Sequence, residues 1–187
     1  VVTMSEDGSP IPWQAPGLSA TDGDGDVLYW SLAALPGRGS ATVSGVGASP
    51  VVLHYAPQAN FSGTDAFTVS VSDGNLTDQV VVQVEVTGVN DVPAITSNGG
   101  GDSAVITVSE NQIAVTTVRA DDPDGDVLTY ALIGGADRAK FGIDPTTGLL
   151  SFLAGPDFEQ PTDAGGDNVY EVMASVSDGQ AMDLQSL

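Results

Sequence analysis

Cysteine is absent from this 187-residue chain, and only four residues are basic. Without cysteine there is no disulfide and no thiolate metal site, so any ion that cross-links the chain must be held by oxygen atoms. Four cations against 25 acidic residues leave a formal charge of −21, which excludes nucleic-acid binding through a basic face and docking on anionic lipid. The composition favours a divalent cation as the counter-charge.

Long apolar runs are also missing, since none reaches the roughly 18 residues of a membrane span. The chain is nevertheless 41% hydrophobic and 16% charged, a balance typical of a folded chain with a buried core rather than a disordered one. It has neither an initiator methionine nor a signal peptide. We therefore expect a fragment of a longer secreted protein, without membrane insertion.

An internal repeat organises the sequence. Three motifs occur twice in the same order: Thr-x-Ser-Glu at 3–6 and 107–110, Asp-Gly-Asp-Val-Leu at 24–28 and 124–128, and Val-Ser-Asp-Gly at 71–74 and 176–179. The repeat predicts two homologous modules, residues 1–90 and 91–187, with a linker at 88–94. Tandem modules of this kind form extended arrays in which each unit contacts mainly its neighbours.

Within each module the apolar residues alternate with polar ones, as in Val80, Val82, Val84 and Val86. This period of two, with 23 glycines and 11 prolines between the apolar stretches, predicts short half-buried strands and no long helix. The expected fold is all-β, two tandem Ig-like Greek-key β-sandwiches. Only residues 183–187 remain for the last strand of the second module, which therefore looks truncated.

Acidic residues cluster in two equivalent loops, Asp22-x-Asp24-x-Asp26 and the same pattern at 122–126. Carboxylates at alternate positions suit Ca²⁺. An EF-hand is excluded, because its glycine at position 6 and glutamate at position 12 are replaced by Val27 and Ala33 in the first loop. Asp and Gly also build tight turns, so Asp26 and Asp126 either bind the ion or only close the turn.

Further motifs accompany the second loop: Val-Ser-Glu-Asn at 108–111, Asp-Pro-Asp at 122–124, Phe-Gly-Ile-Asp-Pro-Thr-Thr-Gly at 141–148, Asp-Phe-Glu at 157–159, and Tyr170 followed by Asp178. On these motifs the second module resembles the cadherin superfamily, specifically the cadherin-like repeats of large bacterial surface proteins. The first module, with Tyr-Ala-Pro at 55–57 and Asn-Phe-Ser-Gly-Thr-Asp-Ala-Phe at 60–67, is similar to the bacterial tandem-repeat variant. The resemblance covers essentially the whole chain.

The resemblance implies a calcium cluster at each junction between successive modules. It assigns Glu6, Asn90, Asp91, Asp122, Asp124 and Asp178 to the internal junction, Asp22, Asp24 and Asp73 to a preceding module, and Glu110, Asp157 and Glu159 to a following one. Gly88 and Val92 stand where the family linker has Asp and Asn, and Asp65 is a weak substitute for a missing acidic motif. We expect one or two junction ions.

These features predict a calcium-rigidified spacer segment of a bacterial adhesin, extracellular at the cell surface, whose partners are neighbouring modules of the same chain. No enzymatic activity is expected, because the single histidine, His54, lies on an alternating stretch and no nucleophile or phosphate motif occurs. Two alternatives stay open: calcium-dependent binding of polysaccharide, and adhesion between identical modules. An exposed Trp13 would favour polysaccharide binding, whereas a packed Trp13 would favour the spacer.

Overall fold

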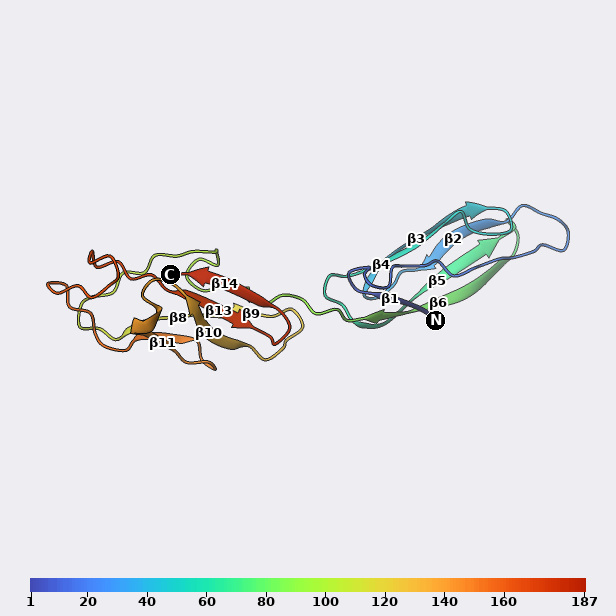
Figure 1. The fold of residues 1–187 in the computed structure, drawn as a ribbon. Helices are drawn as coiled ribbons and strands as arrows, with labels where there is room; N and C mark the ends of the chain where they lie inside the picture. Colours follow the sequence, from blue (N-terminus) through green and yellow to red (C-terminus); the bar gives the residue numbers. More distant parts are fainter. The chain divides into compact units, whose positions relative to one another are not determined.

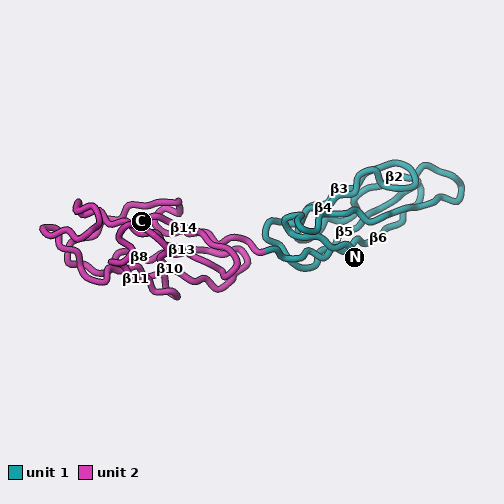
Figure 2. Tube along the Cα trace, viewed as in Figure 1, with its two compact units in different colours: residues 1–89 teal, residues 90–187 magenta.

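The computed structural model describes residues 1–187 and divides into two compact units, Val1–Val89 and Asn90–Leu187 (Figure 2). Strands account for all the regular structure except one short 3₁₀ turn, η1 (Arg138–Lys140). The prediction of an all-β chain is confirmed. No helix in the structure has the length and apolar character needed to cross a membrane.

Unit 1 contains six strands in one hydrogen-bonded order, β1-β6-β5-β2-β3-β4 (Figure 1). They are β1 (Val2–Ser5), β2 (Tyr29–Ala34), β3 (Gly39–Val46), β4 (Val52–Pro57), β5 (Gly63–Ser72) and β6 (Thr77–Thr87). All neighbours are antiparallel except β1, which runs parallel to the end of β6. Strand β6 is thus held on both sides, by β1 and by β5.

The apolar alternation of β6 determines which face of the strand is buried. Val82, Val84 and Val86 are buried, while Gln83 and Glu85 between them are exposed. The alternation fails at Val80, which is 42% exposed and lies outside the buried cluster. The valines pack with aromatic residues of β4 and β5 whose rings stack at 5.9 Å, and Trp30 of β2 is buried with them.

Unit 2 contains the remaining strands. They form the sheets β10-β13-β14, β11-β12-β8 and β7-β9. The bounds are β7 (Ala94–Ile95), β8 (Ala114–Thr117), β9 (Ala120–Asp121), β10 (Thr129–Gly134), β11 (Phe141–Ile143), β12 (Leu149–Phe152), β13 (Met173–Ser177) and β14 (Met182–Ser186). Leu132 and Val176 from the first sheet share one core with Leu150 and Phe152 from the second, which gives the sandwich its buried layer.

The last strand differs between the units. Strand β14 has five residues, whereas β6 has eleven. The stretch 105–108 of unit 2, which corresponds in sequence to β1, forms no strand. One side of unit 2 therefore lacks the pairing that closes the same side of unit 1.

Candidate metal sites

Asp122, Asp124 and Asp126 lie in the turn between β9 and β10 of unit 2. One Oδ atom of Asp122 accepts the backbone amides of Asp124 at 2.9 Å and Asp126 at 3.2 Å, which folds the loop around this side chain. One oxygen from each of the three carboxylates lies within 4.8 Å of the others. The second Oδ atom of Asp122 is buried and accepts no hydrogen bond. A buried carboxylate oxygen without a donor is a favourable position for a cation.

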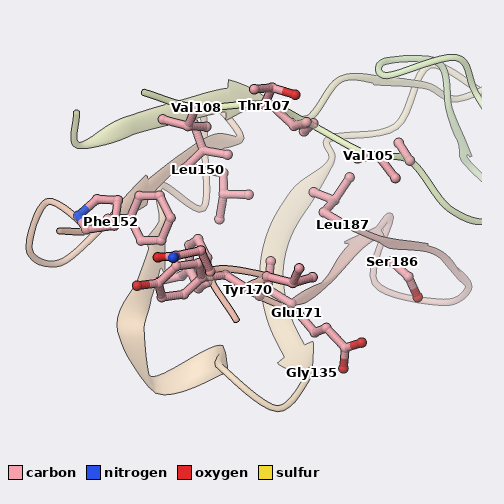
Figure 3. A pocket seen from close by; sticks show the side chains of 18 of the residues that line it. Val105, Thr107, Val108, Gly135, Leu150, Phe152, Tyr170, Glu171, Ser186 and Leu187 are labelled. Carbon is pink, nitrogen blue, oxygen red and sulfur yellow. The ribbon is translucent and has the colours of Figure 1, made fainter. Parts of the chain in front are cut away.

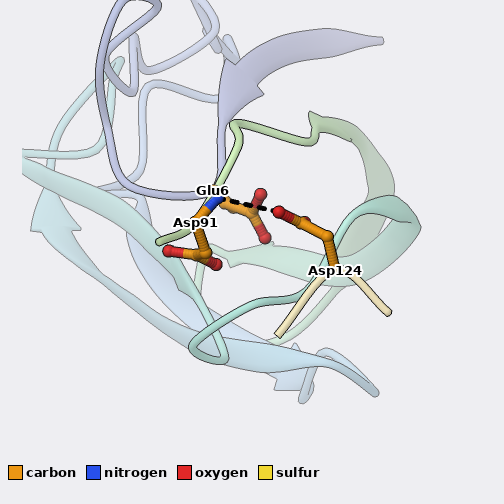
Figure 4. Close-up of side chains that lie close together, drawn as sticks. All are labelled: Glu6, Asp91 and Asp124. Carbon is orange, nitrogen blue, oxygen red and sulfur yellow. Dashed lines mark hydrogen bonds between the residues drawn. The ribbon is translucent and has the colours of Figure 1, made fainter. Parts of the chain in front are cut away.

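The start of unit 2 is hydrogen-bonded to the same end of the sandwich. The amide of Asp91 donates to Asp124 at 2.8 Å (Figure 4). The side chain of Asn90 donates to Asp178 at 2.9 Å and accepts from Gln180 at 2.6 Å. Four of the residues assigned to the internal junction are therefore linked pairwise within unit 2.

Asp178 is held in its ionised form. The backbone amide of Ala181, the side chain of Asn90 and the amide of Gln180 all donate to its carboxylate, and they lower its pKa below the usual value. Hydrogen bonds to the charged form of a carboxylic acid have this effect because protonation would weaken them. Asp178 therefore presents a negative charge beside the linker at neutral pH.

Glu6, the junction residue assigned to unit 1, is buried there. Its carboxylate accepts the amide of Val89 at 2.6 Å, and its own amide donates to the carbonyl of Thr87 at 3.1 Å. Val89 is the last residue of unit 1. The Glu6 carboxylate is thus hydrogen-bonded to the residue that directly precedes Asn90.

Glu110, Asp157 and Glu159 form a second group in unit 2, with one oxygen from each within 4.8 Å of the others. Glu110 accepts the amide of Phe158 at 3.2 Å, which joins two segments 48 residues apart. Asp157 accepts the amide of Glu159 at 3.0 Å. The structure therefore brings together all three residues assigned to a following module.

Asp22, Asp24 and Asp73 are not among the groups whose oxygens converge. Asp22 accepts the amides of Asp24 and Asp26 at 2.9 Å, as Asp122 does in unit 2. Asp73 instead accepts hydrogen bonds from the backbone amides of its own turn. These bonds lower its pKa, and the bond from Leu76 has the largest effect. The first residue of each loop therefore has a turn role, whereas Asp126 but not Asp26 adds its carboxylate to a cluster.

Asp65, named above as a weak substitute ligand, has a different role in the structure. Its carboxylate accepts the amides of Gly37 and Arg38 at 2.9 Å, the amide of Ala66 at 2.8 Å and the Tyr55 hydroxyl at 3.0 Å. Burial raises the pKa of Asp65, but these hydrogen bonds outweigh it and the pKa lies below the usual value. Asp65 anchors the loop between β2 and β3.

Two further buried acids were not identified from the sequence. Asp137 accepts the amides of Ala164 and Glu171 at 2.7 and 2.9 Å, and Asp163 accepts those of Asp167 and Asn168 at 3.0 Å. Asp163 begins an Asp-Ala-Gly-Gly-Asp run that has a turn signature, but nothing in the local sequence around Asp137 points to partners 27 and 34 residues away. Both acids hold loops rather than converging with other carboxylates.

Trp13 is half-buried and packs in the core of unit 1. Its ring lies 5.7 Å from Tyr55 and 6.5 Å from Phe67, and its indole N–H donates to the carbonyl of Leu53 at 3.3 Å. His54 is exposed on β4 between Leu53 and Tyr55. Trp13 is therefore used for packing, which was the arrangement expected of a spacer.

Comparison with known proteins supports the same fold. The sequence model of a family described as bacterial Ig domain matches residues 1–85. The chain is 36% identical to mouse Protocadherin Fat 2 over 121 residues, 58% of this chain and 3% of that protein. It is 32% identical to Chitinase A of Pseudoalteromonas piscicida over 114 residues, 60% of this chain and 13% of that protein.

Among solved structures, the extracellular cadherin domains 1–5 of Protocadherin Gamma B2 match with a TM-score of 0.61 at 16% identity, over 100% of this chain and 37% of that one. The chain thus spans a small part of the curated relatives it matches. Cadherin-like domains are typically extracellular and non-enzymatic, and they serve in adhesion or as spacers. The resemblance predicted from the sequence is confirmed: the chain is cadherin-like.

Proposed function

We propose that this chain is a calcium-stiffened spacer segment of a bacterial cell-surface adhesin, in which residues 1–90 and 91–187 act as successive modules. The observation that carries the proposal is the bonding of the linker. Val89 binds the Glu6 carboxylate, Asn90 binds Asp178 and Asp91 binds Asp124. Three consecutive residues are thus tied to acidic side chains of both units.

Repulsion between the carboxylates makes the stiffness of the junction depend on the bound ion. Carboxylates about 5 Å apart near a protein surface repel one another by on the order of 1 to 3 kcal/mol per pair. A bound divalent cation reverses the sign of that interaction and joins every carboxylate that ligates it. Without the ion the linker residues gain freedom, and with it the two modules share one charged centre.

Calcium is the favoured ion because every available ligand is an oxygen atom. Ca²⁺ accepts six to eight oxygen ligands in flexible geometry, whereas Mg²⁺ demands a tighter octahedron. Glu6, Asn90, Asp91, Asp122, Asp124 and Asp178 would hold the junction ion, and Asp22, Asp24 and Asp73 would complete a site with a preceding module. Glu110, Asp157 and Glu159 would do so with a following module, so the partners are neighbouring modules of the same chain.

The bacterial setting is supported by the bacterial Ig match over residues 1–85 and by the likeness to a bacterial chitinase. An extended array of such modules would hold a distal binding domain away from the cell. The chain's own charge of −21 would keep neighbouring arrays apart.

Small-angle X-ray scattering tests the proposal, in about 1–5 mM Ca²⁺ and in excess chelator, because extracellular calcium modules commonly saturate in this range. We expect a narrow distribution of distances between the modules with calcium and a broad one with chelator. The double variant Asp122→Asn, Asp124→Asn should give the broad distribution in both conditions. Glu85→Gln, an exposed acid on β6 outside every cluster, is the control and should behave as the unmodified chain. Identical curves with calcium and chelator would reject the proposal.

A second candidate is calcium-dependent binding of polysaccharide, which the likeness to Chitinase A favours. The packed position of Trp13 argues against a sugar-binding platform there. Co-sedimentation with insoluble chitin, with and without calcium, separates this function from the spacer. Adhesion between identical modules, for which a matched protocadherin cis-dimer is a precedent, would appear as calcium-dependent dimers in analytical ultracentrifugation.

A further inference from the structure

The outward face of the unit 1 sheet carries an aromatic ring at its centre. Tyr29 begins β2, the strand between β5 and β3, where it lies opposite Val46 of β3 and Ser72 of β5. Residues directly opposite in antiparallel strands lie on the same face of the sheet. The side chains of Tyr29 and Val46 are 54% and 58% exposed, and neither belongs to the core of the unit. The ring is therefore presented to solvent by a strand that is paired on both sides.

Polar side chains surround this ring. Ser31 lies opposite Ser44 of β3 and Ser70 of β5, and Ser70 lies opposite Gln79 of β6. Ser31, Ser44 and Gln79 are exposed, and their side chains make no hydrogen bond within the protein. Their hydroxyl and amide groups can each donate and accept, so a ligand rich in hydroxyls can replace the water bound there. We call the following outward residues the Tyr29 face: Tyr29, Ser31, Ser44, Val46 and Gln79.

The Tyr29 face is uncharged, although the chain has a formal charge of −21. The two rows of outward residues that contain Tyr29 and Ser31 hold no Asp, Glu, Lys or Arg on β2, β3, β5 or β6. Asp78, next to Gln79, alternates to the opposite side of β6, where it is paired with Val71. A face without charge fits an uncharged occupant, and it offers neither a carboxylate for a cation nor a partner for a basic peptide.

The internal repeat shows that the fold does not require these residues. The matching positions of unit 2 carry different side chains: Thr129 for Tyr29, Ala131 for Ser31 and Leu184 for Gln79. The next residue along the strand is instead a buried aromatic in both units, Trp30 and Tyr130. The inward aromatic thus belongs to the shared core, whereas the outward one is specific to unit 1.

Unit 2 has an apolar pocket of about 680 Å³ (Figure 3). Leu150 and Phe152 of the core line this pocket, together with Tyr170. Such a lining suits apolar groups and lacks the exposed hydroxyls and amide that flank Tyr29. The two units therefore present chemically different surfaces, and the one suited to a hydroxyl-rich ligand lies on unit 1.

We propose that the Tyr29 face binds a neutral β-1,4-linked polysaccharide, and does so without calcium. The sugar rings of such a chain have flat C–H faces with hydroxyls at their edges. The C–H face of one ring packs on Tyr29 and Val46, and the edge hydroxyls bind the polar side chains of the face. This role rests on the polysaccharide-binding function given above as the second candidate, and it adds the binding surface, the class of sugar and the independence from calcium.

A second copy of the chain fits the Tyr29 face less well. Stable protein interfaces centre on a well-packed apolar core with aromatic anchors, whereas this face has one aromatic ring among hydroxyls. Two copies of a chain with a charge of −21 also repel each other. A neutral sugar meets neither obstacle.

The test is an NMR titration of the ¹⁵N-labelled whole chain with cellohexaose and, separately, with chitohexaose, both in excess chelator. Additions up to about 5 mM detect millimolar dissociation constants. We expect at least one of the two sugars to shift amide signals of β2, β3, β5 and β6 around Tyr29. The change Tyr29→Thr, which introduces the residue of the matching position in unit 2, should weaken binding at least about 10-fold, because it removes the stacking ring.

The matched control is Phe158→Thr, which removes an aromatic side chain that is 65% exposed in unit 2. This variant should bind the sugar as the unmodified chain does. Equal weakening by both changes would overturn the proposal. An amide spectrum of Tyr29→Thr that is unchanged away from β2 and its neighbours shows that this variant keeps the fold.

The remaining outcomes separate this proposal from the function on which it rests. Shifts confined to other parts of the chain, or shifts that need calcium, would overturn the Tyr29 face and leave polysaccharide binding in place. No shift with either sugar, with or without calcium, would overturn both. Shifts of the same amides that grow with protein concentration in the absence of sugar would mean that a second copy covers the face, which would also overturn the proposal.

Discussion

At the scale of single residues, aspartate has two separate roles in this chain. Asp65, Asp137 and Asp163 each accept several amides and fasten loops to the sandwich. Asp124 converges with other carboxylates, and Asp122 does so while also accepting the amides of its own loop. The first role stabilises the fold by hydrogen bonding, and the second brings like charges together, whose repulsion the proposed calcium ion would relieve.

Replacing Asp65 tests the first role. The change Asp65→Asn replaces one of the two accepting oxygens by an NH₂ group, which cannot accept the hydrogen bonds that this oxygen receives, either those of Gly37 and Ala66 or those of Arg38 and Tyr55. We expect it to lower the free energy of unfolding by about 1–3 kcal/mol, measured by denaturant titration. The control Glu85→Gln removes the same charge from an exposed site and should change stability by less than about 0.5 kcal/mol. Equal effects would show that the Asp65 bonds contribute nothing specific.

The pair of Asp65 and Tyr55 also predicts a pH dependence. The pKa of Asp65 is lowered in the folded chain, so its contribution is present above the unfolded value of about 3.9 and is lost as the pH falls through the folded value. Burial, followed by the hydrogen bond to Asp65, raises the pKa of Tyr55, so stability is lost as the pH rises above about 10. Denaturant midpoints measured across the pH range should show both losses, and Tyr55→Phe should reduce the alkaline one. An unchanged alkaline loss in Tyr55→Phe would contradict the assignment.

At the scale of strands and turns, the two units share the alternation of apolar and polar residues, but the last strand is eleven residues long in unit 1 and five in unit 2. The valines of β6 are buried because β1 and β5 flank the strand.

In unit 2 the backbone turns tightly before β12, where Gly148 has φ +68° and its amide donates to the carbonyl of Asp144 at 2.9 Å. A Cβ at Gly148 would collide with the carbonyl oxygen of Val118.

The change Gly148→Ala should therefore destabilise unit 2 by more than the cost of positive φ alone, which is about 1 kcal/mol for a non-glycine residue. Gly166→Ala is the matched control, since Gly166 has φ +70° and no atom within 4 Å of its Cβ position. Thermal or denaturant unfolding of both variants measures the difference. Equal destabilisation by the two changes would mean that the backbone at Val118 yields without cost.

At the scale of the whole molecule, an ion that binds only the folded chain must stabilise it. For a dissociation constant of about 0.1–1 mM, about 10 mM Ca²⁺ adds roughly 1.4–2.7 kcal/mol for each site. We expect melting temperature to rise with calcium, to fall back with chelator and to respond less to magnesium. The double variant Asp122→Asn, Asp124→Asn should lose most of the shift. An equal rise in melting temperature with calcium and with magnesium in that variant would indicate general screening of the chain's negative charge instead.

The local sequence contains enough to predict much of this protein. Alternation along β6 depends on residues two apart, so the all-β fold could be predicted directly. Asp22 was assigned to a calcium site with a preceding module, and its turn role came from the structure, where it accepts the amides of Asp24 and Asp26. The resemblance to cadherins needed motifs in a fixed order, and the comparisons confirm it. Val80 follows the same alternation as Val82 but is exposed, because burial depends on what covers that end of the strand.

The sequence by itself determined the strand pattern, the repeat and the concentration of acid in loops, because each follows from side-chain period and local backbone preference. Only the tertiary structure decided how those acids are used. Asp137 accepts the amides of Ala164 and Glu171 from 27 and 34 residues away, and Asp65 receives a hydroxyl and backbone amides from three different segments. Such meetings depend on how strands pack and pair, and spacing along the chain does not encode them.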